Sequence, residues 1–160
     1  MEDRDAPRIR FAAIGDSFTE GVGDERPDGS VRGWADVLAS HLATVTAGPI
    51  GYANVAVRGR LLGPIVTDQL DAVLALEPAP TLLTLNGGGN NMLRPGMNAD
   101  HLVAITEQAM IRCIDAGVHP VLISGPDPSE RLPMGGTFRR RGEILTAAII
   151  DLGERYDITV

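Results

Sequence analysis

The chain has 160 residues, of which 44% are hydrophobic, and its 21 acidic and 14 basic residues give a formal net charge of −7. This length suits one domain, and the apolar content is ordinary for a globular core. An acidic chain without a basic stripe is a poor nucleic-acid binder, because neutralising phosphates requires clustered Lys or Arg. The one arginine cluster, at residues 139–141, is interpreted as a solvated helix start.

The composition also argues against export and against a membrane span. The first ten residues, "MEDRDAPRIR", are charged and lack the apolar segment of a signal peptide. No run approaches the ~18 apolar residues that a membrane helix requires. Cys113 is the only cysteine, so no internal disulfide can form. We therefore expect a cytoplasmic protein.

Apolar strand patterns alternate with helical stripes along the chain. An apolar run over residues 9–14 stops at Gly15, and a helical stripe follows over residues 31–43. The pattern then predicts a strand over 52–57 and a helix that begins near Pro64, which suits a first helical turn.

The second half of the sequence continues this alternation. A strand over 81–86 ends in three glycines, and Asn98 is a candidate cap for the next helix. A strand over 121–124, an amphipathic helix around 144–152 and the start of a fifth strand at 157–160 complete the pattern. Strands that alternate with helices in this way indicate βαβ units and a parallel sheet with helices on both faces.

Ligands of such sheets bind at the carboxyl ends of the strands, so the loops "GDSFTEGVGD", "RGR" and "NGGGNNMLRP" are the informative ones. Ser17 lies in the first loop and is a candidate nucleophile. Gly59 in the second loop can present a bare backbone N–H, and the amide of Asn90 in the third can donate to an anion. Each residue alone is also an ordinary turn former. Their convergence on one sheet edge favours a catalytic interpretation.

These three loops resemble the sequence blocks of the SGNH, or GDSL, family of serine esterases and lipases. "GDSFTEGVGD" is similar to the family's first block, with Ser17 as the nucleophile. "NVAVRG" is similar to the second block, whose glycine is Gly59, and "GGNN" is similar to the third, G-x-N-D, whose asparagine is Asn90. The resemblance extends over essentially the whole chain, in order.

The resemblance implies a three-layer α/β/α, flavodoxin-like fold with a five-stranded parallel sheet, in a single domain over residues 1–160. It implies hydrolysis of a small-molecule ester through an acyl-enzyme at Ser17. The oxyanion hole would consist of the backbone N–H groups of Ser17 and Gly59 and the side chain of Asn90. The resemblance implies no metal and no organic cofactor.

The sequence departs from the family pattern in two places. Asn91 occupies the usual position of an aspartate that supports the loop, so we expect a tuning effect there. The family's last block, D-x-x-H, supplies the catalytic base and its carboxylate after strand five, and no D-x-x-H occurs in the chain. We therefore expect a chain that lacks its C-terminal portion, with the last strand and the final helix incomplete. Such a chain should be weakly active or inactive, and its open sheet edge should favour self-association.

The three histidines do not obviously replace the missing base. His41 and His119 are expected at the opposite edge of the sheet, and His101 alone is expected at the edge that carries Ser17. Two other functions therefore stay open. One is an inactive relative that binds acyl ligands without turnover. The other is a flavodoxin-like phosphate or nucleotide binder, although the sequence has neither G-K-[ST] nor a dinucleotide fingerprint.

Overall fold

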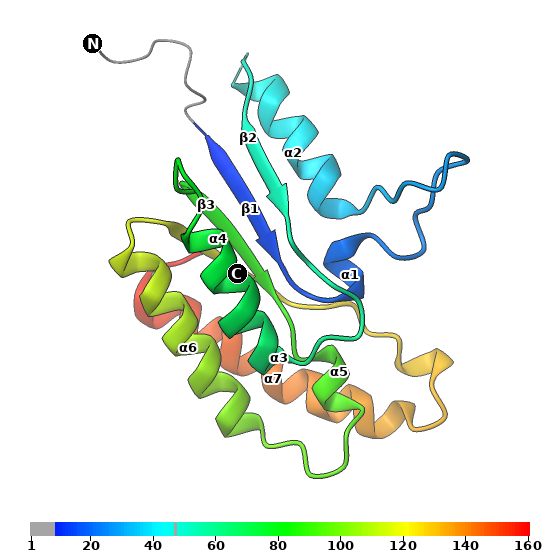
Figure 1. Ribbon diagram of the computed structural model, residues 1–160. Coiled ribbons are helices and arrows are strands. Elements are labelled where there is room, and N and C mark those ends of the chain that lie inside the picture. Colours follow the sequence, from blue (N-terminus) through cyan, green and yellow to red (C-terminus); the bar gives the residue numbers. More distant parts are fainter. Residues whose placement is uncertain (1–8, 47) are drawn as a thin grey trace.

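Four parallel strands form the sheet of the computed structural model, which describes residues 9–46 and 48–160 (Figure 1). Their order across the sheet is β2-β1-β3-β4. The chain therefore moves one way from β1 to β2 and the other way to β3, which creates a switch point where ligands bind in such folds. The strands are β1 (Arg10–Ile14), β2 (Gly51–Asn54), β3 (Leu82–Asn86) and β4 (His119–Ile123).

Alternation of side chains along β1 divides the core into two clusters. Phe11 and Ala13 pack with Ala35 and Ala39 of α2 (Trp34–Val45) on one face of the sheet. Ala12 and Ile14 point to the opposite face, because successive strand side chains alternate. Figure 1 shows α2 on one side of the sheet and α4 and α6 on the other.

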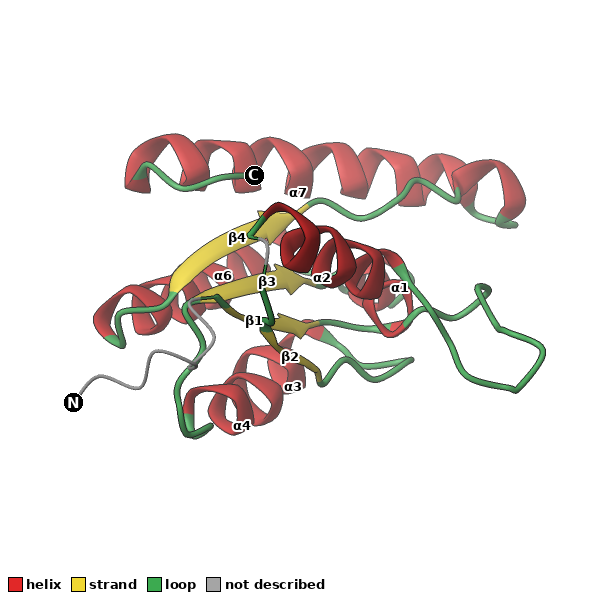
Figure 2. Ribbon diagram, turned by 90° about the horizontal axis from the view of Figure 1, so that it is seen from above, coloured by secondary structure: helices red, strands yellow, loops and turns green. Residues whose placement is uncertain are grey.

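The second cluster lies under a longer helical layer. That layer consists of α3 (Leu62–Pro64), a π-helical turn η1 (Ile65–Gln69), α4 (Leu70–Leu74) and α6 (Ala99–Asp115). The last helix, α7 (Gly135–Tyr156), packs against α6 and lies beyond β4 in Figure 2. The predicted three-layer α/β/α arrangement with a parallel sheet is confirmed.

The predicted fifth strand is not confirmed. Residues 157–160 run beside β4, where the Leu122 N–H donates to the Thr159 carbonyl at 3.0 Å, but they form no strand. One ladder bond does not establish the repeated pairing that defines a strand. The sheet of the described residues therefore has four strands, with β4 at its edge.

The second strand and the helix after it also differ in their bounds from the prediction. β2 ends at Asn54 rather than at residue 57, and the Asn54 side chain accepts the Ala56 N–H at 3.1 Å. Residues 55–57 still run beside β1, since the Val55 and Val57 N–H groups donate to the Ala13 and Gly15 carbonyls. The helix expected to begin near Pro64 begins at Leu62 and contains the π-helical turn. By contrast, the predicted cap at Asn98 is confirmed, since its side chain accepts the His101 N–H at 2.9 Å.

The prediction that the chain has no signal peptide rests on residues 1–10, of which residues 1–8 lie outside the described residues. In the part of the chain that the structure describes, none of the helices has the length and apolar character needed to cross a membrane.

Candidate active site

The end of β1 is held by Gln69, a buried residue of the π-helical turn η1. The Gln69 side chain accepts the Gly15 N–H at 2.8 Å and donates to the Gly15 carbonyl at 2.9 Å. A side chain at position 15 would lie only 2.6 Å from the Thr19 hydroxyl, so glycine alone fits this turn. Gln69 thereby fixes the backbone two residues before Ser17.

Ser17 is the first residue of α1 (Ser17–Glu20), and Asp16 caps that helix. The Asp16 carboxylate accepts the Phe18 N–H at 3.2 Å and is only 6% exposed. Burial raises the pKa of Asp16, with the Phe18 hydrogen bond acting against that rise. The Ser17 side chain is half-buried at the carboxyl end of β1.

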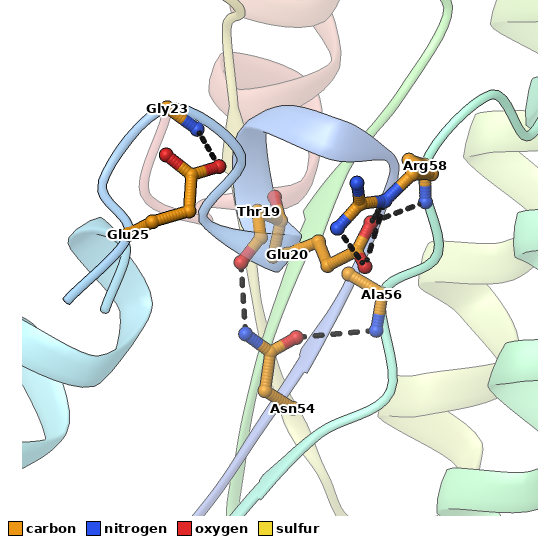
Figure 3. A network of polar contacts seen from close by, with 7 residues as sticks. All are labelled: Thr19, Glu20, Gly23, Glu25, Asn54, Ala56 and Arg58. Atoms are coloured by element: carbon orange, nitrogen blue, oxygen red, sulfur yellow. Dashed lines mark hydrogen bonds and ion pairs between the residues drawn. The ribbon is translucent and has the colours of Figure 1, made fainter. Parts of the chain in front are cut away.

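Gly59 lies in the turn after β2 and has a positive φ of 76°, which a glycine adopts without strain. Two sets of contacts join this loop to α1 (Figure 3). The Asn54 amide donates to the Thr19 carbonyl at 2.8 Å. The Glu20 carboxylate accepts the Arg58 backbone N–H and forms an ion pair with the Arg58 side chain. The loops of the first two blocks are therefore directly connected.

Asn90 lies in α5 (Gly89–Met92), after β3, and its amide nitrogen connects the other two loops. It donates to the Asp16 carboxylate at 3.3 Å and to the Arg60 carbonyl at 3.0 Å. The amide thus lies between the residue before Ser17 and the residue after Gly59. Asn91 next to it accepts the Leu62 N–H at 2.9 Å, an acceptor role that an aspartate oxygen fills equally well.

A cavity of about 600 Å³ opens beside Ser17, and Asn90 lines it too. The rest of its wall comes from α1, from the end of β3 and the α5 region, from the loop after β4, and from residues 138–150 of α7. Gly59 is not among the lining residues. The wall is mostly aliphatic and aromatic, through residues that include Phe18, Leu93, Phe138, Leu145 and Ile149.

A charged pair lies on the wall of this cavity. The Arg139 guanidinium donates to the Asp127 carboxylate and to the Ser129 hydroxyl, each at 3.1 Å. Hydrogen bonds from Ser129, together with Arg139, lower the pKa of Asp127. Arg141 donates to the Arg94 carbonyl at 3.0 Å and so connects α7 to the loop after α5. Arg139 and Arg140 are exposed near the start of α7, as expected for a solvated helix start, whereas Arg141 is half-buried and departs from that expectation.

None of the three histidines, all within the described residues, lines the cavity. His41, His101 and His119 are all exposed. The structure therefore supplies no imidazole at the cavity wall in residues 9–46 and 48–160.

Two residues of this region were not identified from the sequence. Asp16 is part of the G-D-S block, yet its burial and its contact with Asn90 appear only in three dimensions. Gln69 left a detectable signal, because it interrupts the apolar stripe of Leu62, Val66 and Val73 with a polar side chain. A polar residue on a buried helical face requires a hydrogen-bonding partner.

Solved esterases share this fold. AlinE4, an SGNH-hydrolase family esterase, matches with a TM-score of 0.73 at 17% identity, over 94% of this chain and 74% of AlinE4. The psychrotrophic esterase EstA from Pseudoalteromonas sp. matches with a TM-score of 0.69 at 18% identity, over 94% of this chain and 74% of EstA. Axe2, an acetylxylan esterase from Geobacillus stearothermophilus, matches with a TM-score of 0.69 at 16% identity, over 93% of this chain and 75% of Axe2.

Sequence comparison places the chain more specifically than these fold matches do. None of the curated proteins matches it. The model of the GDSL-like lipase/acylhydrolase family matches residues 13–160, a range that begins within β1 and includes all three loops described above. The chain belongs to the GDSL-like lipase/acylhydrolase family.

Proposed function

We propose that the chain is a serine ester hydrolase that forms an acyl-enzyme at Ser17. The observation that carries this proposal is the shared cavity. Ser17 and Asn90 line the same space of about 600 Å³, and the Asn90 amide contacts both neighbouring loops. Family membership supports the same class of reaction.

In the proposed reaction the Ser17 hydroxyl oxygen attacks the ester carbonyl carbon. The carbonyl oxygen becomes an oxyanion, which the N–H groups of Ser17 and Gly59 and the amide of Asn90 stabilise. Collapse of this intermediate expels the alcohol, which takes up a proton, and leaves the acyl group on Ser17. Water then attacks the acyl-enzyme, releases the carboxylic acid and returns the proton to the Ser17 oxygen.

The Asn90 amide must change partners to take part. Its two N–H groups are directed to the Asp16 carboxylate and the Arg60 carbonyl. The contact with Asp16 is the longer one, at 3.3 Å. We propose that this contact is exchanged for the oxyanion when substrate is bound.

The chain alone should be only weakly active. A serine hydroxyl needs a base within hydrogen-bond reach to become a nucleophile, and no histidine lines the cavity among the described residues. In one solved structure of the relative Axe2, described as a catalytic mutant, alanine replaces a histidine. We infer that added imidazole raises the activity of this chain.

The same observation favours a second candidate function. A cavity with a serine and, among the described residues, no histidine at its wall suits a protein that binds acyl ligands without turning them over. The two candidates differ in whether Ser17 becomes acylated once a base is provided.

Chemical rescue with imidazole separates them. We expect a fluorophosphonate to label Ser17 slowly, and added imidazole to accelerate the labelling at least about tenfold. Ser17→Ala should take up no label under either condition, as read by intact-protein mass spectrometry. Ser17 that stays unlabelled with imidazole present would reject the hydrolase proposal in favour of ligand binding. Rapid labelling without imidazole would show that the chain already holds a base, and His101→Ala would then be the first variant to make.

A further inference from the structure

The loop that carries Gly59 is held from one side by α1, the helix that carries Ser17. Glu20 is the last residue of that helix, and its Oε2 accepts the Arg58 backbone N–H at 2.6 Å (Figure 3). The Arg58 guanidinium donates to the same carboxylate, from Nε at 3.1 Å and from a terminal nitrogen at 3.0 Å. One carboxylate thus binds both the backbone and the side chain of Arg58.

Gly59 itself has nothing to pack against. A Cβ atom built at this position would meet no atom within 4 Å, and its φ of 76° lies outside the range that other residues favour. The direction of the Gly59 N–H is therefore set by the residues on either side. Arg58 is bonded to Glu20 on one side, and the Arg60 carbonyl accepts from Asn90 on the other.

Exposed ion pairs contribute little stability by themselves, typically about 0–1 kcal/mol. The Glu20–Arg58 contact differs from such a pair because it includes a backbone donor, and because the Glu20 side chain is only 24% exposed. The Arg58 hydrogen bonds also lower the pKa of Glu20, so the carboxylate stays ionised at neutral pH. The Glu20–Arg58 contact therefore matters more for the position of the Arg58 backbone than for stability.

We propose that Glu20 is a positioning residue for the oxyanion hole. By holding the Arg58 backbone N–H, its carboxylate sets where the Gly59 N–H lies relative to Ser17, and the Arg58 side chain keeps that carboxylate in place. This inference rests on the proposed function, because it assigns Gly59 and Ser17 as oxyanion donors. It adds a residue that touches no substrate.

Five variants test the proposal by hydrolysis of 4-nitrophenyl acetate with imidazole present, after the hydrolysis that imidazole catalyses without protein is subtracted. Glu20→Ala removes the acceptor and should lower kcat about 10- to 100-fold with KM changed less than about twofold, since a displacement near 1 Å costs on that order. Glu20→Gln keeps an acceptor oxygen and should recover most of that loss. Arg58→Ala keeps its backbone N–H on Glu20 and should lose less than about threefold.

Glu25 provides the matched control. Its carboxylate also accepts a backbone N–H, that of Gly23 at 2.9 Å, but it contacts neither Arg58 nor Gly59 through any hydrogen bond in the described residues. Glu25→Ala should leave kcat unchanged. All rates are compared well below each variant's melting temperature. Hydrogen exchange of the backbone amide at position 58 should be faster in Glu20→Ala than in Arg58→Ala.

The outcomes distinguish this inference from the function on which it rests. Hydrolysis by Ser17→Ala at the wild-type rate would reject the proposed function itself. If Ser17→Ala loses hydrolysis while Glu20→Ala keeps the wild-type kcat, the positioning role of Glu20 is rejected and the proposed function stands. Equal losses in Glu20→Ala, Arg58→Ala and Glu25→Ala would likewise overturn it, because they would point to a general effect of charge or folding.

Discussion

Asn90 is the residue at which three parts of the chain meet. Its amide contacts the Asp16 carboxylate from the first loop and the Arg60 carbonyl from the second. The sequence predicted that Ser17, Gly59 and Asn90 would converge, because each follows a parallel strand. It could not predict Asp16 as the partner of Asn90, since that contact depends on how closely two loops approach.

We predict that Asn90→Ala lowers kcat by ~10²–10³, with KM little changed, when imidazole serves as the base. The physical reason is the loss of one oxyanion donor. Steady-state hydrolysis of 4-nitrophenyl esters of rising chain length gives both constants.

Asn98→Ala is the control for that variant. Asn98 caps α6 by accepting the His101 N–H and does not line the cavity. Its replacement should cost about 1 kcal/mol of unfolding free energy and leave kcat unaltered. A similar kcat in Asn90→Ala and Asn98→Ala would show that Asn90 is no oxyanion donor and that its contacts are only structural.

The π-helical turn is the element that the sequence described least well. Helical periodicity identified the stripe through residues 62–74, but periodicity cannot distinguish an α-helix from one that contains a wider turn. The wider turn brings Gln69 onto Gly15. The apolar stripe was visible in the sequence, whereas the partner of its polar member lies 54 residues away.

Replacing Gln69 tests this element. We predict that Gln69→Met lowers the free energy of unfolding by about 1–3 kcal/mol, because the buried Gly15 N–H loses its partner. Labelling of Ser17 with imidazole present should also slow, since the backbone before it is released. Urea denaturation and labelling rates measure the two effects. Gln108→Met, at an exposed glutamine of α6, should change neither quantity, and equal behaviour of the two variants would refute the role of Gln69.

Cys113 reports on the helical layer over the sheet. It is fully buried in α6, and burial raises the pKa of its thiol from 9.0 to about 11. The folded state therefore keeps a proton that the unfolded state releases, so the free energy of unfolding should fall as pH rises from about 9 to about 11.

The same burial makes Cys113 a probe of opening. At pH 8 a disulfide reagent such as dithionitrobenzoate should react negligibly with the native protein and stoichiometrically in urea. Fast native reaction, measured by absorbance, would mean that α6 opens readily.

At the scale of the whole molecule, the edge strand β4 leaves part of the sheet without a helix. Val121 pairs with Thr84, which in turn pairs with Ala13 on the α2 face. No β4 residue belongs to the buried cluster under α2 or to the partly buried residues that pack on it. The order of the layers was predictable from the alternation of strands and helices. How much of the sheet face α2 covers was not predictable, because it depends on where α2 lies over the twisted sheet.

We predict that this face of β4 associates with a second copy, because an apolar sheet face without a helix over it favours association. Sedimentation velocity over a range of concentrations should show reversible self-association. Val121→Arg should suppress it, while Val37→Arg, at an exposed valine of α2, should not. A wild-type protein that stays monomeric throughout would refute the prediction.

The π-helical turn also gives the chain one place where it can change length. Such a turn holds about one residue more than an α-helical turn, so deleting one residue within Ile65–Gln69 would leave a regular α-helix whose flanking residues keep their faces. Gln69 is the one position in this turn that such a deletion cannot take, because Gly15 would lose its partner although every residue at the strand ends would be intact. An alignment of related chains can therefore place a gap in this turn as long as it keeps a glutamine opposite Gly15.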